Sequence, residues 1–213
     1  MTNKCARGFA LSLAVLFLAS AALGQAGENN VPVITTFRSQ CEPDTCIEKT
    51  LYLPDFSTAY ELQAVVNIVR TIADIRYVFP NASEHTILLK GTAEQLAVTD
   101  RLVSVIRSLR ASGNHDRTSV LVYELKGFVL QQGNHVPSAA AYSSNCELTT
   151  CFIKALYLPD LSTTAQLSDV LNKVRTTANI THMAYVPLST SGHVIVIRGT
   201  QEQLALAEKA ATE

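Results

Sequence analysis

The sequence predicts an α+β fold that consists of two tandem β-α-β-β-α modules, each a small sheet with two helices packed on one face. Three observations lead to this prediction. The chain contains an internal repeat, its strand-length apolar runs end at a Pro-Asp pair, and helix-capping boxes recur at the same places in both repeats. Placing both helices on one face is the economical packing for this order of elements.

The repeat is the most secure feature of the sequence. Residues 41–75 align with residues 146–180 at an offset of 105, and 20 of the 35 positions are identical. Further along, the offset becomes 108, because GTAEQLA from Gly91 matches GTQEQLA from Gly199. The second copy therefore has three extra residues, which we place in a loop around residues 188–192.

Each copy opens with a short strand and a capped helix. Thr50–Leu53 and Ala155–Leu158 are apolar runs that end at Pro-Asp, as a strand does at a breaker. A Thr followed three residues later by Glu or Gln then predicts a helix start, because each side chain can bond to the other residue's backbone amide. These pairs are Thr58 with Glu61 and Thr163 with Gln166.

The first helix of each copy has one apolar face. Its apolar residues recur at i, i+3, i+4 and i+7, which is the spacing of a buried stripe. They are Leu62, Val65, Val66, Val69 and Ile72 in the first copy and Leu167, Val170, Leu171 and Val174 in the second.

Two further strands and a second helix complete each copy. Ile75–Phe79 and Thr86–Leu89 alternate around a predicted turn at Pro80-Asn81, and Met183–Val186 and Val194–Ile197 flank the longer loop. Capping boxes again predict the helix starts, at Thr92 with Gln95 and at Thr200 with Gln203. The buried stripe of this helix in the first copy continues through Leu102, Ile106 and Leu109, and the second copy's helix is predicted to be shorter.

Two segments lie outside this pattern. Val33–Arg38 is predicted to form a hairpin with Glu48–Leu53 through the Cys41–Cys46 turn. Ser119–Leu130 is apolar and β-branched enough for a strand, which either completes the first module or opens the second.

The N-terminus has the features of a secretory signal peptide. Lys4 and Arg7 precede an apolar run over residues 9–18, and small residues follow up to a cleavage site between Gly24 and Gln25. This run is too short to cross a hydrocarbon core of about 30 Å comfortably, and no later stretch is long and apolar enough. We therefore expect a periplasmic protein with no transmembrane segment after cleavage.

The expected organisation is a signal peptide at residues 1–24, a first module at 30–112 and a second at 118–213, with a hinge at 112–117. Removal of the signal peptide leaves 15 basic and 18 acidic residues, a formal charge of −3 spread without a block of either sign. Nucleic-acid binding depends on clustered Lys and Arg, so this composition argues against such a partner.

Each copy carries two cysteines in a C-x4-C spacing directly before its first core strand. Residues i and i+5 face each other across a four-residue hairpin loop, so we expect structural disulfides Cys41–Cys46 and Cys146–Cys151. Two alternatives stay open. One is a redox-active pair, for which a C-x-x-C spacing at the start of a helix is typical. The other is a zinc site, which would need the two cysteine pairs to come together although they recur in separate modules.

The sequence contains no motif for catalysis, a cofactor or a metal. It lacks G-x-S-x-G, a phosphate-binding glycine loop and H-E-x-x-H. The histidines fall in loops or at strand ends and no two hold matching places in the copies; they are His85, His115, His135, His182 and His193. We therefore expect a protein that is not an enzyme.

Two polar pairs recur between the copies. Asp55 and Asp160 follow the first strand and are predicted turn residues, because a general acid would need a recurring partner. Arg70 and Arg175 recur within N-x-V-R-T of the first helix. Each arginine is expected either to pair with a carboxylate of its own module or to lie at an interface, which makes both candidate interface residues.

Most of each copy resembles the periplasmic N-domains of secretins. The resemblance is carried by LYLPD-ST at the end of the first strand, by LxxVVNxVRT in the first helix, and by a Gly-Thr pair and EQLA at the second helix. It covers about residues 47–110 and 152–213, and Leu62, Val65, Val69, Gly91, Thr92 and Leu96 match the pattern. It implies a ring-building module, although the outer-membrane β-barrel of secretins is absent and the C-x4-C hairpins are not a usual feature of those domains.

Three functions compete. The first is a scaffold or adaptor of the bacterial cell envelope, which associates with itself or with an envelope assembly protein and predicts an apolar or Arg-bearing patch on both modules. The second is a periplasmic protein that binds a small ligand or glycan in a polar pocket between the modules, lined by Tyr52, Tyr157 or Tyr185. The third, a periplasmic enzyme, would need a convergent set of titratable residues.

Overall fold

The structure of the protein is a computed structural model. It describes residues 31–34, 37–38, 46–112, 117–125, 128–129, 150–161, 163–188 and 192–213. Val31–Glu213 form one compact unit, and the predicted signal peptide lies outside the described residues. Within the described ranges, no helix has the length and apolar character needed to cross a bilayer.

The described residues form an α+β fold, as predicted. The helices are α1 (Ala59–Ile72), α2 (Ala93–Ala111), α3 (Thr164–Ala178) and α4 (Gln201–Thr212). The strands are β1 (Val33–Ile34), β2 (Phe37–Arg38), β3 (Ile47–Tyr52), β4 (Tyr77–Asn81), β5 (Thr86–Gly91), β6 (Thr118–Leu125), β7 (Phe128–Val129), β8 (Cys151–Leu158), β9 (His182–Pro187) and β10 (His193–Gly199).

The two copies of the repeat have the same order of elements and the same sheet topology. The first copy runs β3-α1-β4-β5-α2, and its sheet has the antiparallel order β3-β5-β4. The second copy runs β8-α3-β9-β10-α4 and repeats this order as β8-β10-β9. Its sheet is extended by β6, antiparallel to β8, and by β1, parallel to β6.

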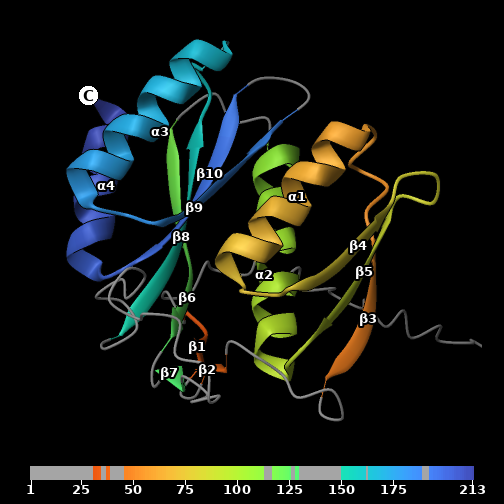
Figure 1. The fold of residues 1–213 in the computed structure, drawn as a ribbon. Coiled ribbons are helices and arrows are strands. Elements are labelled where there is room, and N and C mark those ends of the chain that lie inside the picture. Colours follow the sequence, from red (N-terminus) through yellow and green to blue (C-terminus); the bar gives the residue numbers. More distant parts are fainter. Residues whose placement is uncertain are drawn as a thin grey trace, which may run out of the picture. The chain divides into compact units, whose positions relative to one another are not determined.

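The elements of Val31–Glu213 stack in alternating layers (Figure 1). Helices α3 and α4 pack together on one face of the second sheet, while α1 and α2 pack on its other face. The same α1 and α2 also cover the first sheet, so that they lie between the two sheets. The order of layers is therefore helices, second sheet, helices, first sheet.

This stacking gives the two copies a shared core. One cluster of buried residues joins α1 and α2 to both sheets, and a second joins α3 and α4 to the remaining face of the second sheet. The expectation that residues 30–112 and 118–213 are separate domains stays a prediction, because the shared core leaves open whether either copy folds without the other.

All four predicted capping boxes form, one at the start of each helix. In the second helix of each copy the capping glutamine has a further role. Gln95 Nε2 donates to the carbonyl oxygen of Asp74 at 2.8 Å, and Gln203 Nε2 donates to that of Asn179 at 2.9 Å. Asp74 and Asn179 follow the first helix with φ of 61° and 49°, a left-handed conformation that Asp and Asn tolerate. The end of one helix is thus tied to the start of the next.

The capping acid of α1 is buried and paired with a cation. Glu61 is 5% exposed, and its Oε1 accepts from Arg110 Nη2 at 2.8 Å. The Arg110 guanidinium also lies 5.3 Å from the centre of the Phe56 ring. A buried carboxylate needs such a partner. The second copy has the neutral Gln166 at the place of Glu61.

One expectation about the strands is wrong. Val33–Arg38 does not pair with Glu48–Leu53, because β1 pairs with β6 and β2 pairs with β7, while β3 pairs with β5. The segment Ser119–Leu130, for which the sequence leaves two placements open, supplies most of β6, which joins the second copy's sheet, and β7, which pairs with β2 in a separate sheet. An apolar alternation predicts that a strand forms, but it does not identify the neighbouring strand when the partner is distant in sequence.

The predicted turn at Pro80-Asn81 is also misplaced. Both residues belong to β4, and the turn follows at residues 82–85. Proline is tolerated there because β4 is at the edge of the first sheet, where one side of the strand has no ladder to join.

The longer loop of the second copy needs a glycine at its end. Gly192 has φ of 83°, and a Cβ there would lie 2.5 Å from the carbonyl oxygen of Leu158. Its carbonyl oxygen accepts from the Leu188 amide at 3.1 Å, which closes the loop between β9 and β10.

Candidate functional site

The first sheet exposes a face rich in aromatic side chains. On the side of β3, β5 and β4 away from the helices, the large exposed apolar residues are Tyr52, Tyr77, Phe79 and Leu88, with exposed fractions of 64, 53, 58 and 39%. Glu48 and Lys90 lie on the same side and form an ion pair of 3.2 Å. We call this set of six residues the open face. Tyrosine and phenylalanine are enriched in the buried centres of protein interfaces.

The repeat-equivalent positions of the second sheet are buried. Tyr52, Phe79 and Leu88 correspond to Tyr157, Ala184 and Val196, which are 4, 8 and 0% exposed. We call this side of the second sheet the covered face: Ile153, Ala155, Tyr157, Ala184, Val186, Val194, Val196 and Arg198. Its apolar members belong to the core cluster that contains α1 and α2.

Helix α1 can cover two sheets because it is apolar on two sides. The stripe that includes Val65 and Val69 faces its own sheet, and Ala64 and Ile68, which lie on an adjacent side of the helix, are 6 and 1% exposed. At the places of Ala64 and Ile68, α3 carries Asp169 and Lys173, and both are exposed. Helix α3 therefore covers one sheet only.

A buried arginine joins the covered face to the end of α1. Arg198 is 2% exposed, and its Nη1 donates to the carbonyl oxygen of Ile72 at 2.8 Å. A cation at this place is favourable because the last carbonyls of a helix carry partial negative charge. The residue equivalent to Arg198 in the first copy is Lys90, which belongs to the open face.

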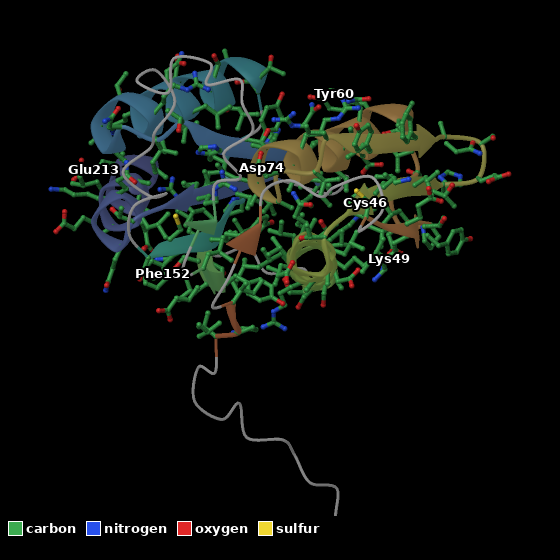
Figure 2. All side chains as sticks on the ribbon, turned by 60° about the horizontal axis from the view of Figure 1, so that its bottom comes forward. Cys46, Lys49, Tyr60, Asp74, Phe152 and Glu213 are labelled. Carbon is green, nitrogen blue, oxygen red and sulfur yellow. The ribbon has the colours of Figure 1, made fainter. Side chains whose placement is uncertain are left out.

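The charge of Arg198 acts on two titratable neighbours. Burial raises the pKa of Asp74 above its ordinary 3.8, and the charges of Arg198 and Arg76 oppose this shift. Burial, and then the charge of Arg198, lower the pKa of His182 from 6.5 to about 4. Because its pKa is about 4, His182 is neutral at neutral pH, so no second positive charge lies beside the buried guanidinium. Asp74 is labelled near the middle of the view in Figure 2.

A groove of about 320 Å³ lies between the two copies, and we call it the inter-copy groove. Helix α1 contributes polar residues, and α3 and β9 contribute a mixed set. The lining residues are Tyr60, Gln63, Ala64, Asn67, Thr71, Leu171, Arg175, Met183, Ala184 and Tyr185. Tyr60, labelled in Figure 2, stands at the first turn of α1 and is 58% exposed.

Two hydrogen bonds order part of the groove. The hydroxyl groups of Tyr60 and Tyr185 lie 3.4 Å apart, and Gln63 Nε2 donates to Asn67 Oδ1 at 3.1 Å. The hydrogen bond with Tyr60 is the main cause that raises the pKa of the Tyr185 hydroxyl, and partial burial adds to it. The groove thus offers hydroxyl groups, amides, a guanidinium and aromatic rings, which suits a polar ligand better than an apolar one.

The two candidate interface arginines have different surroundings, although both are exposed. Arg70 Nη2 donates to the carbonyl oxygen of Val78 at 3.0 Å, while Arg175 lines the inter-copy groove. The ion pairs found among the described residues include neither arginine, so the expected carboxylate partners are not found there. Their role at an interface stays a prediction.

Asp55 and Asp160 lie in the turn that follows the first strand, as expected. Each carboxylate also meets an arginine: Arg107 Nε lies 2.9 Å from Asp55, and Arg117 Nε lies 3.0 Å from Asp160. Arg117 Nη1 further donates to the carbonyl oxygen of Thr212 at 2.9 Å and so caps α4. These contacts stabilise the fold and give the aspartates a structural role.

The expectation that no two histidines hold matching places is wrong. His85 and His193 are equivalent at the offset of 108. The Nδ1 atom of His85 lies 3.2 Å from the carbonyl oxygen of Phe56, and that of His193 lies 3.1 Å from the carbonyl oxygen of Leu161. Burial lowers the pKa of His193. Both histidines tie the start of a strand to the turn after Pro-Asp; His115 and His135 lie outside the described residues.

Two of the four repeat cysteines lie within the described residues. Cys46 directly precedes β3, Cys151 begins β8 with 0% exposure, and both are disulfide-bonded. Cys41 and Cys146 lie outside the described residues, so the pairing Cys41–Cys46 and Cys146–Cys151 stays a prediction. In the part of the chain that the structure describes, no cluster of His, Cys, Asp and Glu could hold a metal ion.

No protein-family model matches the chain, and no curated protein matches its sequence closely enough to indicate a family.

The open and covered faces could have been recognised from a difference between the copies. In the second copy Val194–Ile197 is apolar at every position, whereas the equivalent residues Thr86–Leu89 of the first copy begin with a polar one. Thr50 is likewise replaced by Ala155. Strands buried on both faces are apolar throughout, and strands with one solvated face alternate.

Paired alanine substitutions test the equivalence of the two faces. Val196→Ala should lower the free energy of unfolding by about 2 kcal/mol, because it removes buried methyl groups from the covered face. Leu88→Ala, at the same repeat position, should change it by less than about 0.5 kcal/mol because Leu88 lies on an exposed surface. Urea unfolding of the two variants checks this. Equal losses would contradict the assignment of the two faces.

The shifted histidine predicts a pH dependence. Between pH 6.5 and about 4 the unfolded chain binds a proton at His182 that the folded chain does not, so His182 lowers stability as the pH falls through this window. His182→Gln should therefore lose less stability than the wild type between pH 7 and pH 4.5. Asp74 titrates in both proteins and cancels in the comparison. Urea unfolding across this range measures the difference, and parallel curves would contradict it.

Proposed function

We propose that the protein is an exported, non-enzymatic adaptor of the bacterial cell envelope, which binds another protein through the open face of its first sheet. The proposal includes cleavage of the signal peptide at residues 1–24 and residence in the periplasm. It also includes the likeness to secretin N-domains, and with it a role in an envelope assembly.

One observation carries the proposal: the open face is exposed, while its repeat-equivalent in the same chain is buried. Tyr52, Phe79 and Leu88 are exposed by 64, 58 and 39% on one continuous sheet surface. Contiguous exposed apolar patches are uncommon on monomers, and aromatic ones mark interaction sites. The covered face has the same backbone topology and is occupied by helices, which supports a docking role for the open face.

The structure offers less support for an enzyme. The titratable groups with perturbed pKa values include Asp74, His182 and Glu208; burial is the main cause of the shift for Asp74 and His182, and a hydrogen bond is the main cause for Glu208. Glu208, for example, has a lowered pKa chiefly because of its hydrogen bond with Lys154. An active site would need such groups to converge at an accessible place with a nucleophile or an acid-base pair.

Site-specific photocrosslinking tests the adaptor function. The full chain should be expressed in the bacterium that makes it, with p-benzoylphenylalanine in place of Leu88 or, as a control, of the exposed Lys173 on α3. We expect a periplasmic adduct with a second protein from the Leu88 position and none from the Lys173 position. In the same sample the mature chain should begin at Gln25.

Absence of any adduct from the Leu88 position, or equal adducts from both positions, would contradict docking through the open face. Mass spectrometry of the adduct identifies the partner. An adduct of two copies of this chain would replace the adaptor with a self-associating scaffold.

The inter-copy groove favours a second candidate function, the binding of a small ligand or cell-wall glycan. The groove lies between the copies and is lined by Tyr60, Tyr185 and Arg175. Exposed tyrosine rings can stack on sugar rings, and the guanidinium suits a carboxylate. Of the tyrosines expected to line such a pocket, Tyr157 is buried on the covered face and Tyr52 lies on the open face.

A titration with matched arginine variants tests this second function. Soluble peptidoglycan fragments that carry carboxylates should bind the mature protein in calorimetry. Arg175→Ala should weaken their binding about tenfold, which is the size of one lost charged hydrogen bond. Arg70→Ala, at the same repeat position but outside the groove, should leave the affinity unchanged. Binding that is absent, or equally sensitive to both changes, would exclude the groove as this site.

A further inference from the structure

We propose that the open face binds a layer of two amphipathic helices supplied by a different protein, in the way that α1 and α2 cover the second sheet. This inference rests on the proposed function and specifies the partner's surface. It starts from the fact that one chain contains the same sheet surface twice, once exposed and once occupied.

The occupied example defines what fits such a sheet. On the covered face, Ala184 and Val196 are buried in one cluster with Ala64 and Ile68 of α1. Helix α1 thus contributes a small and a branched apolar side chain from a second side, next to the stripe that faces its own sheet. The open face has the same strand order and register, so a helix pair can lie on it along the same direction.

Charge placement points to helices as the occupant. On the covered face Arg198 donates to the carbonyl oxygen of Ile72 at the C-terminal end of α1. Lys90 stands at the equivalent place of the open face, where it is half-exposed and forms a surface ion pair with Glu48. A cation at this place matches the negative end of a helix that arrives as α1 does. The face of a second sheet would offer no such end.

The chain's own outer helix α3 does not fit. At the places where α1 has Ala64 and Ile68, α3 has Asp169 and Lys173. Burying both charges against Phe79 and Leu88 without new partners would oppose binding. Helix α3 therefore acts as a polar cap, as terminal repeats of a stack do, and the partner is a different protein.

Replacing Asp169 and Lys173 of α3 by the residues of α1 tests the inference with the full mature chain. The double variant Asp169→Ala, Lys173→Ile gives α3 the residues of α1 and leaves the net charge unchanged. It should associate head to tail through the open face of the next molecule. Light scattering should then find a mass that rises with concentration without a plateau, because a heterologous contact does not close.

Two further variants make the result specific. Adding Leu88→Lys to the double variant should restore the monomer, and Phe79→Ser should do the same if the lysine variant fails to fold by circular dichroism. The matched control is Ser168→Ala, Asn172→Ile, which places the same two side chains one residue earlier on α3 and should stay monomeric.

The outcomes separate this inference from the proposed function. A double variant that stays monomeric, or that associates despite Leu88→Lys, overturns the helix layer as occupant even when photocrosslinks form at the open face. A wild-type dimer that Leu88→Lys dissociates also overturns it, because a second copy then occupies the face. If the double variant associates but no crosslink forms in cells, the open face does accept a helix layer. That result supports this inference and contradicts the adaptor function.

Discussion

The burial of the covered face under α1 and α2 is the contact on which the rest of the structure depends. It requires α1 to be apolar on two sides, and it requires the second sheet to be apolar on both of its faces, as the run Val194–Ile197 is. It also places Arg198 at the end of α1, where the Ile72 carbonyl oxygen accepts a hydrogen bond from the guanidinium, and keeps His182 neutral beside it. Without this contact the two copies would be separate small modules, each with a sheet face exposed to water.

A head-to-tail stack of two copies must leave two unlike ends. One end is the outer side of α3 and α4, and the other is the open face of the first sheet. The two ends are not chemically alike: Asp169 and Lys173 make the exposed side of α3 polar, whereas Tyr52, Phe79 and Leu88 make the sheet end apolar. This asymmetry is the physical basis for assigning one end to solvent and the other to a partner. It also explains why Arg70 and Arg175, equivalent in sequence, have different surroundings, since α1 is an inner helix and α3 an outer one.

The sequence correctly predicted those structural features whose cause lies within a few residues of the chain. A capping box involves residues three apart, so Thr58 with Glu61 and Thr92 with Gln95 could be recognised without any tertiary information. The hairpin of Val33–Arg38 failed because β1 pairs with β6, about ninety residues away, and nothing in a short segment identifies so distant a partner. The matching of His85 with His193 was missed for a simpler reason, because the loop insertion changes the repeat offset from 105 to 108 before those residues.

The sequence by itself determined the repeat, the α+β class, the order of elements and the start of every helix, because these depend on periodicity and on contacts within one or two turns. Only the tertiary structure decided that α1 and α2 serve both sheets and that one sheet face stays exposed. The physical reason is that an apolar residue in a strand indicates that its position can be buried. It does not identify which helix or sheet covers that position. The same holds for the candidate sites: Arg175 and Tyr185 could be singled out from the sequence, but Tyr60 joins them only because α1 of the first copy packs on β9 of the second.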